Sequence, residues 1–333
     1  MLRENRRQLS PQALNSNART FVDLTLGMRT LQLIFRISSS VTIAGGPITA
    51  IRNAGSILSQ FTELGLNENG DDVVRHDPRL AGVISQAHAA RVISSSRLTS
   101  TANGTYTLEE TVLVPLTNPR AVSPSETAFV AKDPRAALQA FFTYTPNVAA
   151  LCNAGAATVT ITAPTVTVHQ VYDDETGENM PLLRPYFQDM VFPVTGTVPN
   201  APFYLKTSRY VRGLLIQQDT NVGEVSDIVT NLILRGDRRT YIGPNAVTFG
   251  DLQRAGEFEF AGDVFRSGYL FIDLQRGGRL SNIINPNTDT NLRLELSVQA
   301  SATAGATSSN VRVGVLGLEV IPGVTSGAVS FDA

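Results

Sequence analysis

The sequence is short of cysteine, lysine, histidine and long apolar runs, and each shortage excludes a class of protein. Cys152 is the only cysteine, so the chain cannot form an internal disulfide or a cluster of thiolate metal ligands. It has no run of about 18 apolar residues, which a transmembrane helix would need. The opening residues MLRENRRQLSPQ lack the apolar stretch of a signal peptide. We therefore expect a chain that is made in the cytoplasm and held together by packing.

Charge is also scarce. Charged residues make up 17% of the 333 residues and the formal net charge is -2, which is too little positive charge for a dedicated nucleic-acid binder. Lys132 and Lys206 are the only lysines, so arginine carries nearly all the positive charge. Its planar guanidinium suits fixed ion pairs at interfaces, although a GC-rich coding bias explains the same preference. The length predicts two domains, each with its own core.

Candidate catalytic groups are few and scattered. His76, His88 and His169 are too far apart for a local metal motif. We interpret His76, in a polar stretch, as a salt-bridged or solvated loop residue, and His169 as an outward-facing strand residue. Cys152 lies among small apolar residues, which favours a buried, inert thiol over a nucleophile. The sequence contains no phosphate-binding or dinucleotide-binding glycine motif, so we expect no cofactor, no bound metal and no enzymatic activity.

Four short polar motifs are interpreted as turns. Asp71-Asp72 and Asp173-Asp174-Glu175 flank turn residues, which favours solvated hairpin carboxylates over paired catalytic acids or calcium ligands. Arg235-Gly236-Asp237 matches a cell-adhesion tripeptide, but a glycine between polar residues after an apolar strand is what a tight hairpin needs. Asn103-Gly104-Thr105 fits a glycosylation sequon only in form, because a cytoplasmic chain is not glycosylated.

Apolar and polar residues alternate with a period of two along much of the chain. The clearest runs are residues 22–28, 31–37, 112–114, 159–161, 166–168, 258–260, 292–298 and 311–320. Alternation with one wet face is typical of antiparallel sheets. The first two runs are either one bent strand or two strands in series, and the reversed parity after Val315 indicates a bulge or bend in the last strand. With turn residues between the runs, the pattern predicts an all-β sandwich.

The two halves of the chain follow the same order of elements. Three-and-four spacing predicts a short helix at residues 51–61 and another at 222–232, each between a long strand and a strand that ends in a turn. Both halves close with a penultimate alternating strand, a small-residue loop and a last strand. Such pairing indicates a duplicated unit. We predict two tandem eight-stranded antiparallel jelly rolls with short helices in loops, over residues 21–178 and 179–333.

Two segments break the alternation. Residues 80–105 and 118–133 are dense in Ala, Ser, Pro and Arg. We expect them to be surface loops and short helices inserted between strands.

Residues 1–20 are expected to form an arm. They have few large apolar side chains before Phe21, where we place the start of the first strand, and they carry Arg3, Arg6, Arg7 and Arg19 against a single glutamate. We expect this arm to be poorly ordered in isolation and to act in assembly. Its positive charge would meet anionic lipid head groups, packaged nucleic acid or an acidic patch on a neighbouring protein. The alternative is a solvated tail without a role.

In order, spacing and duplication of elements, the chain resembles the double jelly-roll major capsid proteins of tailless, membrane-containing icosahedral phages, in the lineage of tectiviruses, corticoviruses and adenoviruses. Residues 210–242 and the stretch that begins YLFIDLQRGG at Tyr269 are most similar to the smaller members. The resemblance spans nearly the whole chain as a pattern of elements, and no single motif carries it.

The resemblance implies a structural protein of the virion capsid, made in the host cytoplasm. Three chains would form a homotrimer whose six jelly rolls make a pseudo-hexagonal capsomer, with strands roughly upright to the shell. The N-terminal arm would lie on the inner side, near a lipid membrane or a neighbouring capsomer. The implied partners are the chain itself, adjoining capsomers and minor capsid or penton proteins, without sequence-specific nucleic acid.

Two other functions fit a β-sandwich. A carbohydrate-binding or viral spike protein would use exposed aromatic platforms, yet tryptophan is absent and aromatic residues total 7%. A cupin-type enzyme would need clustered histidine and glutamate ligands, which the sequence does not supply.

Overall fold

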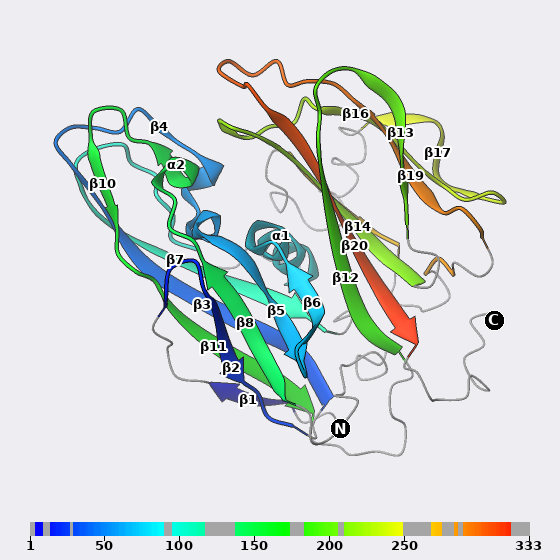
Figure 1. Cartoon of the computed structure of the whole chain (residues 1–333), viewed down its shortest axis with the longest axis horizontal. Coiled ribbons are helices and arrows are strands. Elements are labelled where there is room, and N and C mark those ends of the chain that lie inside the picture. The colour runs from blue at the N-terminus through cyan, green and yellow to red at the C-terminus, as the bar shows by residue number, and fades with distance from the viewer. Residues whose placement is uncertain are drawn as a thin grey trace. The chain divides into compact units, whose positions relative to one another are not determined.

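The structure is a computed structural model that describes residues 4–8, 14–26, 29–89, 95–116, 137–173, 183–205, 210–248, 268–274, 283–285 and 289–320. The chain divides into two compact units, a first that ends at Pro181 and a second that begins at Leu182 (Figure 1). The boundary expected around Glu178 falls in residues 174–182, outside the described part, and stays a prediction.

The first unit contains eleven described strands and short helical segments. The strands are β1 (Glu4–Gln8), β2 (Arg19–Asp23), β3 (Arg29–Ala44), β4 (Ala50–Ile51), β5 (Phe61–Glu68), β6 (Asp71–His76), β7 (Gly104–Pro115), β8 (Leu138–Tyr144), β9 (Cys152–Asn153), β10 (Thr158–Ile161) and β11 (Thr165–Asp173); the helices are η1 (Asn53–Gly55), η2 (Ile57–Gln60), α1 (Pro78–Ala89) and α2 (Val148–Leu151). One sheet has the order β1-β11-β3-β10, with β7 also paired to β3, and the other has the order β2-β8-β5-β6.

The second unit repeats this plan with nine described strands. They are β12 (Leu183–Pro193), β13 (Val198–Tyr204), β14 (Tyr210–Thr220), β15 (Gly223–Glu224), β16 (Val229–Arg235), β17 (Thr240–Thr248), β18 (Tyr269–Asp273), β19 (Arg293–Val298) and β20 (Ser309–Val320). One sheet has the order β12-β20-β14-β15, with β18 also paired to β14, and the other has the order β13-β19-β16-β17.

The principal strands of both units have the same topology. When the eight longer strands of a unit are counted along the chain, one sheet contains the first, eighth, third and sixth, and the other the second, seventh, fourth and fifth. These sheets are β1-β11-β3-β7 and β2-β8-β5-β6 in the first unit, and β12-β20-β14-β18 and β13-β19-β16-β17 in the second. All the pairs are antiparallel. This is the order of a jelly roll, so the predicted pair of eight-stranded jelly rolls is confirmed.

Period-two alternation places one face of each strand in a core. Along β3, Leu33, Phe35 and Ile37 are almost completely buried, while Arg36 between them is exposed. The ring of Phe35 meets Phe142 of the opposite sheet edge-on, with 6.3 Å between centroids. Full burial of such a side chain contributes roughly 1.5–3 kcal/mol, so this face holds the first unit together.

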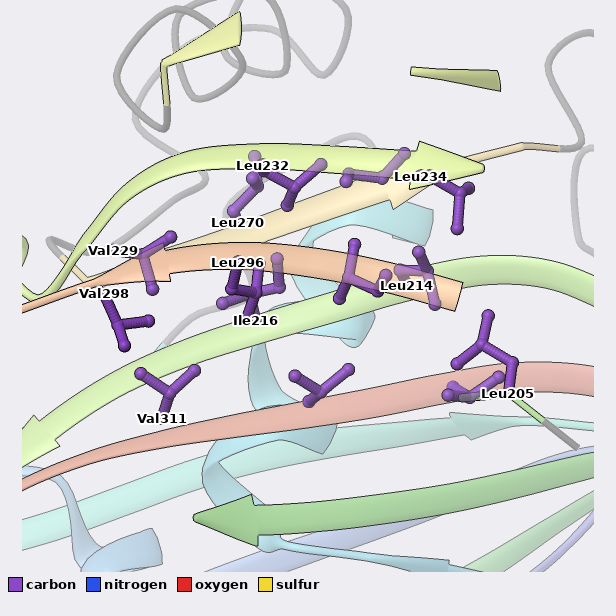
Figure 2. Packing of buried hydrophobic residues seen from close by; sticks show 14 of the residues in the cluster. Leu205, Leu214, Ile216, Val229, Leu232, Leu234, Leu270, Leu296, Val298 and Val311 are labelled. Atoms are coloured by element: carbon purple, nitrogen blue, oxygen red, sulfur yellow. The ribbon is translucent and has the colours of Figure 1, made fainter. Parts of the chain in front are cut away.

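The second unit has an aliphatic core between its two sheets. Figure 2 shows Leu214 and Ile216 of β14, Leu232 and Leu234 of β16 and Leu296 of β19, all of them buried members of one cluster. The side chains come from both sheets, as a sandwich requires. The alternating apolar residues that predicted these strands therefore form the core that holds the two sheets together.

Of the two predicted helices, the first is present as short 3₁₀ turns and the second is wrong. Residues 53–55 and 57–60 form η1 and η2. Residues 222–232 instead contain β15 and the start of β16. The register of β16 against β19 shifts between Val229 and Asn231, so buried Val229 and Leu232 stand three residues apart within a strand. A β-bulge therefore produced the spacing that resembled a helix.

Of the two alternatives for the first two alternating runs, two strands in series is correct, and the strands lie in different sheets, since β2 pairs with β8 and β3 pairs with β11 and β7. Two other details of strand assignment differ from expectation. The penultimate strand of the first half, β10, was expected to correspond to β19. It is instead an additional strand that pairs with β3, and the strand that corresponds to β19 is β8. The predicted bulge of the last strand lies on its partner, because Val211 and Gly213 of β14 face Gly317 and Leu316, which leaves Arg212 as the extra residue.

Residues 80–105 begin in a short helix between two strands, as expected, but the expected surface position is wrong for this part. Helix α1 buries Leu80, Val83 and Ile84. The hydroxyl of Ser85 accepts a hydrogen bond from the backbone nitrogen of Leu113 in β7, at 2.7 Å. The helix therefore covers part of the outer edge of β7, where backbone groups would otherwise be open. Residues 118–133, the other expected loop, lie outside the described part.

The expected arm contains a strand of the first sheet. Residues 4–8 form β1, which pairs with β11 so that Arg6 faces Val171 and Arg7 faces Gln170. The first strand therefore begins at Glu4 and not at Phe21, because backbone pairing with β11 holds a segment that has too few apolar residues to be recognised. Arg3 lies outside the described residues.

Candidate assembly surfaces

A glutamate held by two arginines lies on the outer face of the first unit's four-stranded sheet. Arg19 of β2 donates two hydrogen bonds to the carboxylate of Glu63, at 2.8 and 2.9 Å. Arg75 pairs with the same carboxylate at 2.8 Å, and Thr143 donates to it at 2.8 Å. Arg19 also binds Asp72 at 2.9 Å. The network joins all four strands of the sheet.

Burial and pairing act in opposite directions on Glu63. Burial alone would raise the pKa of this carboxyl, but hydrogen bonds from Arg19 and Thr143, with the charges of Arg19 and Arg75, hold its pKa below the ordinary value. The same bonds raise the pKa of Arg19 against the opposing effect of its burial. The group is therefore a fixed ion pair and not a proton donor at neutral pH.

Arg19 was predicted to be part of a charged arm, and this prediction is wrong. It is the first residue of β2, and its guanidinium carbon lies 4.2 Å from the centroid of the Phe141 ring. Its charge is satisfied by Glu63 and Asp72, so it is held within the sheet.

The second unit has a similar network around Glu295. Arg235 of β16 donates to this carboxylate from Nε at 2.8 Å and pairs through Nη2 at 2.7 Å, and Arg293 donates to it at 2.8 Å. Glu295 is 5% exposed. Burial would raise its pKa, but the two arginines hold the pKa below its ordinary value. Each roll thus carries a rigid Arg–Glu–Arg arrangement on the face of its four-stranded sheet that points away from the core.

The histidines and the cysteine are not brought together. His76 is 3% exposed at the end of β6, so it is neither solvated nor in a loop, while the alternative that it is salt-bridged stays a prediction. His169 is half-buried between two buried neighbours on β11, as an outward-facing strand residue should be. His88 lies in α1. Cys152 is buried and free, as predicted, and burial raises the pKa of its thiol against the charge of Arg52. Within the described ranges, no three His, Cys, Asp or Glu side chains gather as metal ligands.

The first acidic motif lies in a hairpin. Asn69 and Gly70 have φ of 54° and 91° and form the tight turn between β5 and β6. Asp71 and Asp72 follow at the start of β6, where both are exposed. Because Asp72 is bound by Arg19, the turn is an ion-paired hairpin, which agrees with the turn interpretation. Asp173 ends β11, and the rest of the second acidic motif lies outside the described residues.

The Arg-Gly-Asp stretch is also a hairpin, as predicted. Gly236 donates its backbone N–H to the carbonyl of Arg239 at 2.9 Å, between β16 and β17. A Cβ at this glycine would lie 2.2 Å from the carboxyl carbon of Asp289, so any other residue here would force that side chain to move. Asn103 of the formal sequon accepts a hydrogen bond from Gly46, at 3.1 Å.

A buried arginine in the second unit was not predicted from the sequence. Arg212, the bulged residue of β14, is 4% exposed. Burial lowers its pKa to about 10, and the charge of Asp273 offsets part of this effect. Its Nη1 has no hydrogen-bond partner among the residues that the structure describes. An arginine inside an otherwise apolar strand was the available signal.

Comparison with known proteins shows similarity in fold alone. No family model matches the chain, and no curated protein matches it by sequence. Among solved structures, the MCP of STIV aligns with a TM-score of 0.69 and 12% identity, over 96% of this chain and 97% of that one. The major capsid protein of bacteriophage PM2 aligns with a TM-score of 0.59 and 11% identity, over 97% and 100%. The Faustovirus major capsid protein aligns with a TM-score of 0.59 and 7% identity, over 96% and 91%.

These alignments run through both units, so the chain has the two-roll fold of viral major capsid proteins. Among the described helices, none is long and apolar enough to cross a membrane.

Proposed function

We propose that this chain is a structural major capsid protein of an icosahedral virion and performs no catalysis. The main observation behind this proposal is the duplication of the jelly roll within one chain. Two jelly rolls with one strand order follow each other in a single chain, and the whole chain aligns with capsid proteins over nearly its full length. Two like rolls per chain suit a tile in which each roll occupies an equivalent position.

We further propose that three chains associate into a trimer, so that six rolls form a pseudo-hexagonal capsomer that contacts its neighbours and minor capsid proteins. The paired networks around Glu63 and Glu295 support this proposal, because they hold arginines rigidly on outer sheet faces. Fixed arginines are common at interfaces and lose little side-chain entropy when a partner docks.

The N-terminal segment keeps a proposed role in a corrected form. Arg3, Arg6 and Arg7 would lie on the inner side of the shell and meet an anionic surface such as a lipid membrane, while Arg19 serves the sheet. The test is the triple change of Arg3, Arg6 and Arg7 to glutamine, which leaves the backbone pairing of β1 with β11 possible. Trimers should persist while shell assembly or vesicle binding is lost; normal shells and unchanged binding would contradict the role.

Light scattering and negative-stain imaging of the purified chain test the main proposal. The expected result is a species of three chains that appears as a hexagonal particle and closes into shells under assembly conditions. A chain that stays monomeric at every accessible concentration would contradict the proposed function, since obligate interfaces commonly bury more than about 2,000 Å² and are stable on dilution.

A further inference from the structure

Exposed large apolar side chains gather on one edge of each roll. We define the leading edge of a roll as its first two strands, β1 and β2 in the first unit and β12 and β13 in the second, with the residues that follow β2. The exposed large hydrophobic residues of the described chain are Phe21, Leu26, Val191, Val198 and Tyr204. All five lie on a leading edge. Each of these four strands ends its sheet in the described topology, so each edge also presents unpaired backbone.

On the first unit, the apolar side chain is Phe21 of β2. It is 43% exposed and lies on the outer face of the four-stranded sheet, 6.4 Å from the ring of Phe141. Phe141 is fully buried beneath it, and Arg19 stacks on that ring while it binds Glu63. Phe21 therefore stands on a rigid base, which lowers the entropy lost on docking.

On the second unit, the corresponding side chain is Tyr204 of β13. It is 64% exposed and faces Arg293 across the strand pair, and Arg293 binds Glu295. Beneath this edge, Phe192 of β12 and Phe203 of β13 stack with centroids 4.3 Å apart and close the gap between the sheets. Both rolls thus present an exposed aromatic ring on the second strand of the fold, near a glutamate-bound arginine that lies on β2 in the first roll and on β19 in the second.

The far edge of the four-stranded sheets has a different character. In the first unit, β6 exposes Asp71, Asp72 and Arg75, and in the second unit β17 exposes Thr240. Among the residues whose burial the structure describes, the exposed large apolar side chains therefore lie on the leading edges and not on the far edge of either four-stranded sheet. Tyrosine and arginine are the residues most often found to dominate binding energy at interfaces.

We propose that the leading edge of each roll docks against a second copy of this chain, with Phe21 and Tyr204 as the central contacts. This inference rests on the proposed function. An exposed aromatic ring occurs on the second strand of both rolls, and each ring lies near an arginine that binds a glutamate, so the partner must present a complementary surface twice, which a repeated copy of a two-roll chain does. One aromatic ring buries roughly 150–250 Å² and a stable interface about 800 Å² per partner, so each ring would be the centre of a larger contact.

Single carboxylates placed on the edge test this proposal. Phe21→Asp and Tyr204→Asp are compared with Thr240→Asp, which adds the same charge at an exposed position on the opposite edge of the sheet that holds Tyr204. Self-association of the full chain is measured by sedimentation over a range of concentrations. Both edge variants should weaken association at least about thirtyfold, and Thr240→Asp should weaken it less than about threefold. Circular dichroism melts of the dilute chain, with the milder Phe21→Ser and Tyr204→Ser, separate docking from folding.

The outcomes distinguish the two proposals. If the unmodified chain assembles and either edge aspartate leaves assembly unchanged, the docking surface is wrong while the capsid function stands. Equal disruption by Thr240→Asp would also overturn the surface. If the unmodified chain does not associate, the proposed function itself fails.

Discussion

Replacement of Arg212 by methionine should stabilise the second unit. This guanidinium is buried at the bulge of β14, and its Nη1 lacks a hydrogen-bond partner among the described residues. Burial lowers its pKa to about 10, with Asp273 as the opposing charge. Methionine is shorter than arginine but unbranched, has no polar hydrogen and fills irregular space well.

The magnitude follows from the pKa. A fall of the pKa from the ordinary value of an arginine to about 10 means that the fold disfavours the charged form by roughly 3 kcal/mol. Removal of the guanidinium removes this cost. Part of the resulting stabilisation is lost because Asp273 would keep its charge without its cationic neighbour. We expect a net stabilisation of about 1–3 kcal/mol at pH 7, because Asp273 is only a minor opposing charge in the pKa of Arg212; replacement of whole buried ion pairs by apolar groups stabilises by up to about 4 kcal/mol.

The pH dependence gives a second, independent readout. Because the folded pKa of Arg212 lies below its unfolded value, the unfolded chain binds the proton more tightly, and the cost is fully present below pH 10. This cost disappears as the pH rises from about 10 towards the ordinary pKa of an arginine. The unmodified chain should therefore gain stability relative to Arg212→Met across this window.

Urea unfolding followed by circular dichroism measures both effects, with hydrogen exchange of β14 to identify the transition of the second unit. The controls are Asp273→Asn and the double variant, which separate the loss of the arginine from the isolation of the aspartate. A loss of more than about 1 kcal/mol in Arg212→Met, or parallel pH curves above pH 10, would refute the reasoning.

Three further predictions concern other sites. Gly236→Ala should lower stability by about 1–3 kcal/mol in thermal melts, since the new methyl group meets Asp289, while Gly196→Ala, which meets no atom within 4 Å, should change little. Glu295→Gln should lower the free energy of unfolding by about 1–3 kcal/mol at pH 7. In urea titrations the difference between this variant and the unmodified chain should shrink as the pH falls below 4.5, because Glu295 is then protonated as the pH passes its lowered pKa. Cys152 should resist alkylation at pH 8 in the folded chain and react fully in urea.

The jelly rolls could be predicted because a strand with one solvent-exposed face and one buried face has alternating polar and apolar residues in the sequence. Leu33, Phe35 and Ile37 are an example, since their alternation survives in the burial of β3. The paired turns were also readable: Asn69-Gly70 and Gly236 each connect the fourth and fifth strands of a roll. Local chemistry determines such turns, so they can be recognised without the fold.

Elements that depend on distant partners escaped prediction. Strand β1 has little apolar character and is held by pairing with β11, more than 150 residues away. The bulge at Val229 imitated helical spacing because a period-two pattern with one inserted residue places buried positions three apart. Arg19 was read by its charge alone, while its role is set by Glu63 and Asp72, which lie on other strands.

The repeated surface could not have been found by aligning the two halves of the sequence. The central glutamate is Glu63 on β5, the fourth strand of the first roll, but Glu295 on β19, the seventh strand of the second. Strands four and seven are neighbours in a jelly roll, so different sequence positions bring a carboxylate to the same sheet face. Phe21 and Tyr204 do share a strand, β2 and β13, yet a single aromatic residue carries no recognisable motif. The surface becomes visible only when strand order places each ring at an open edge beside a bound arginine.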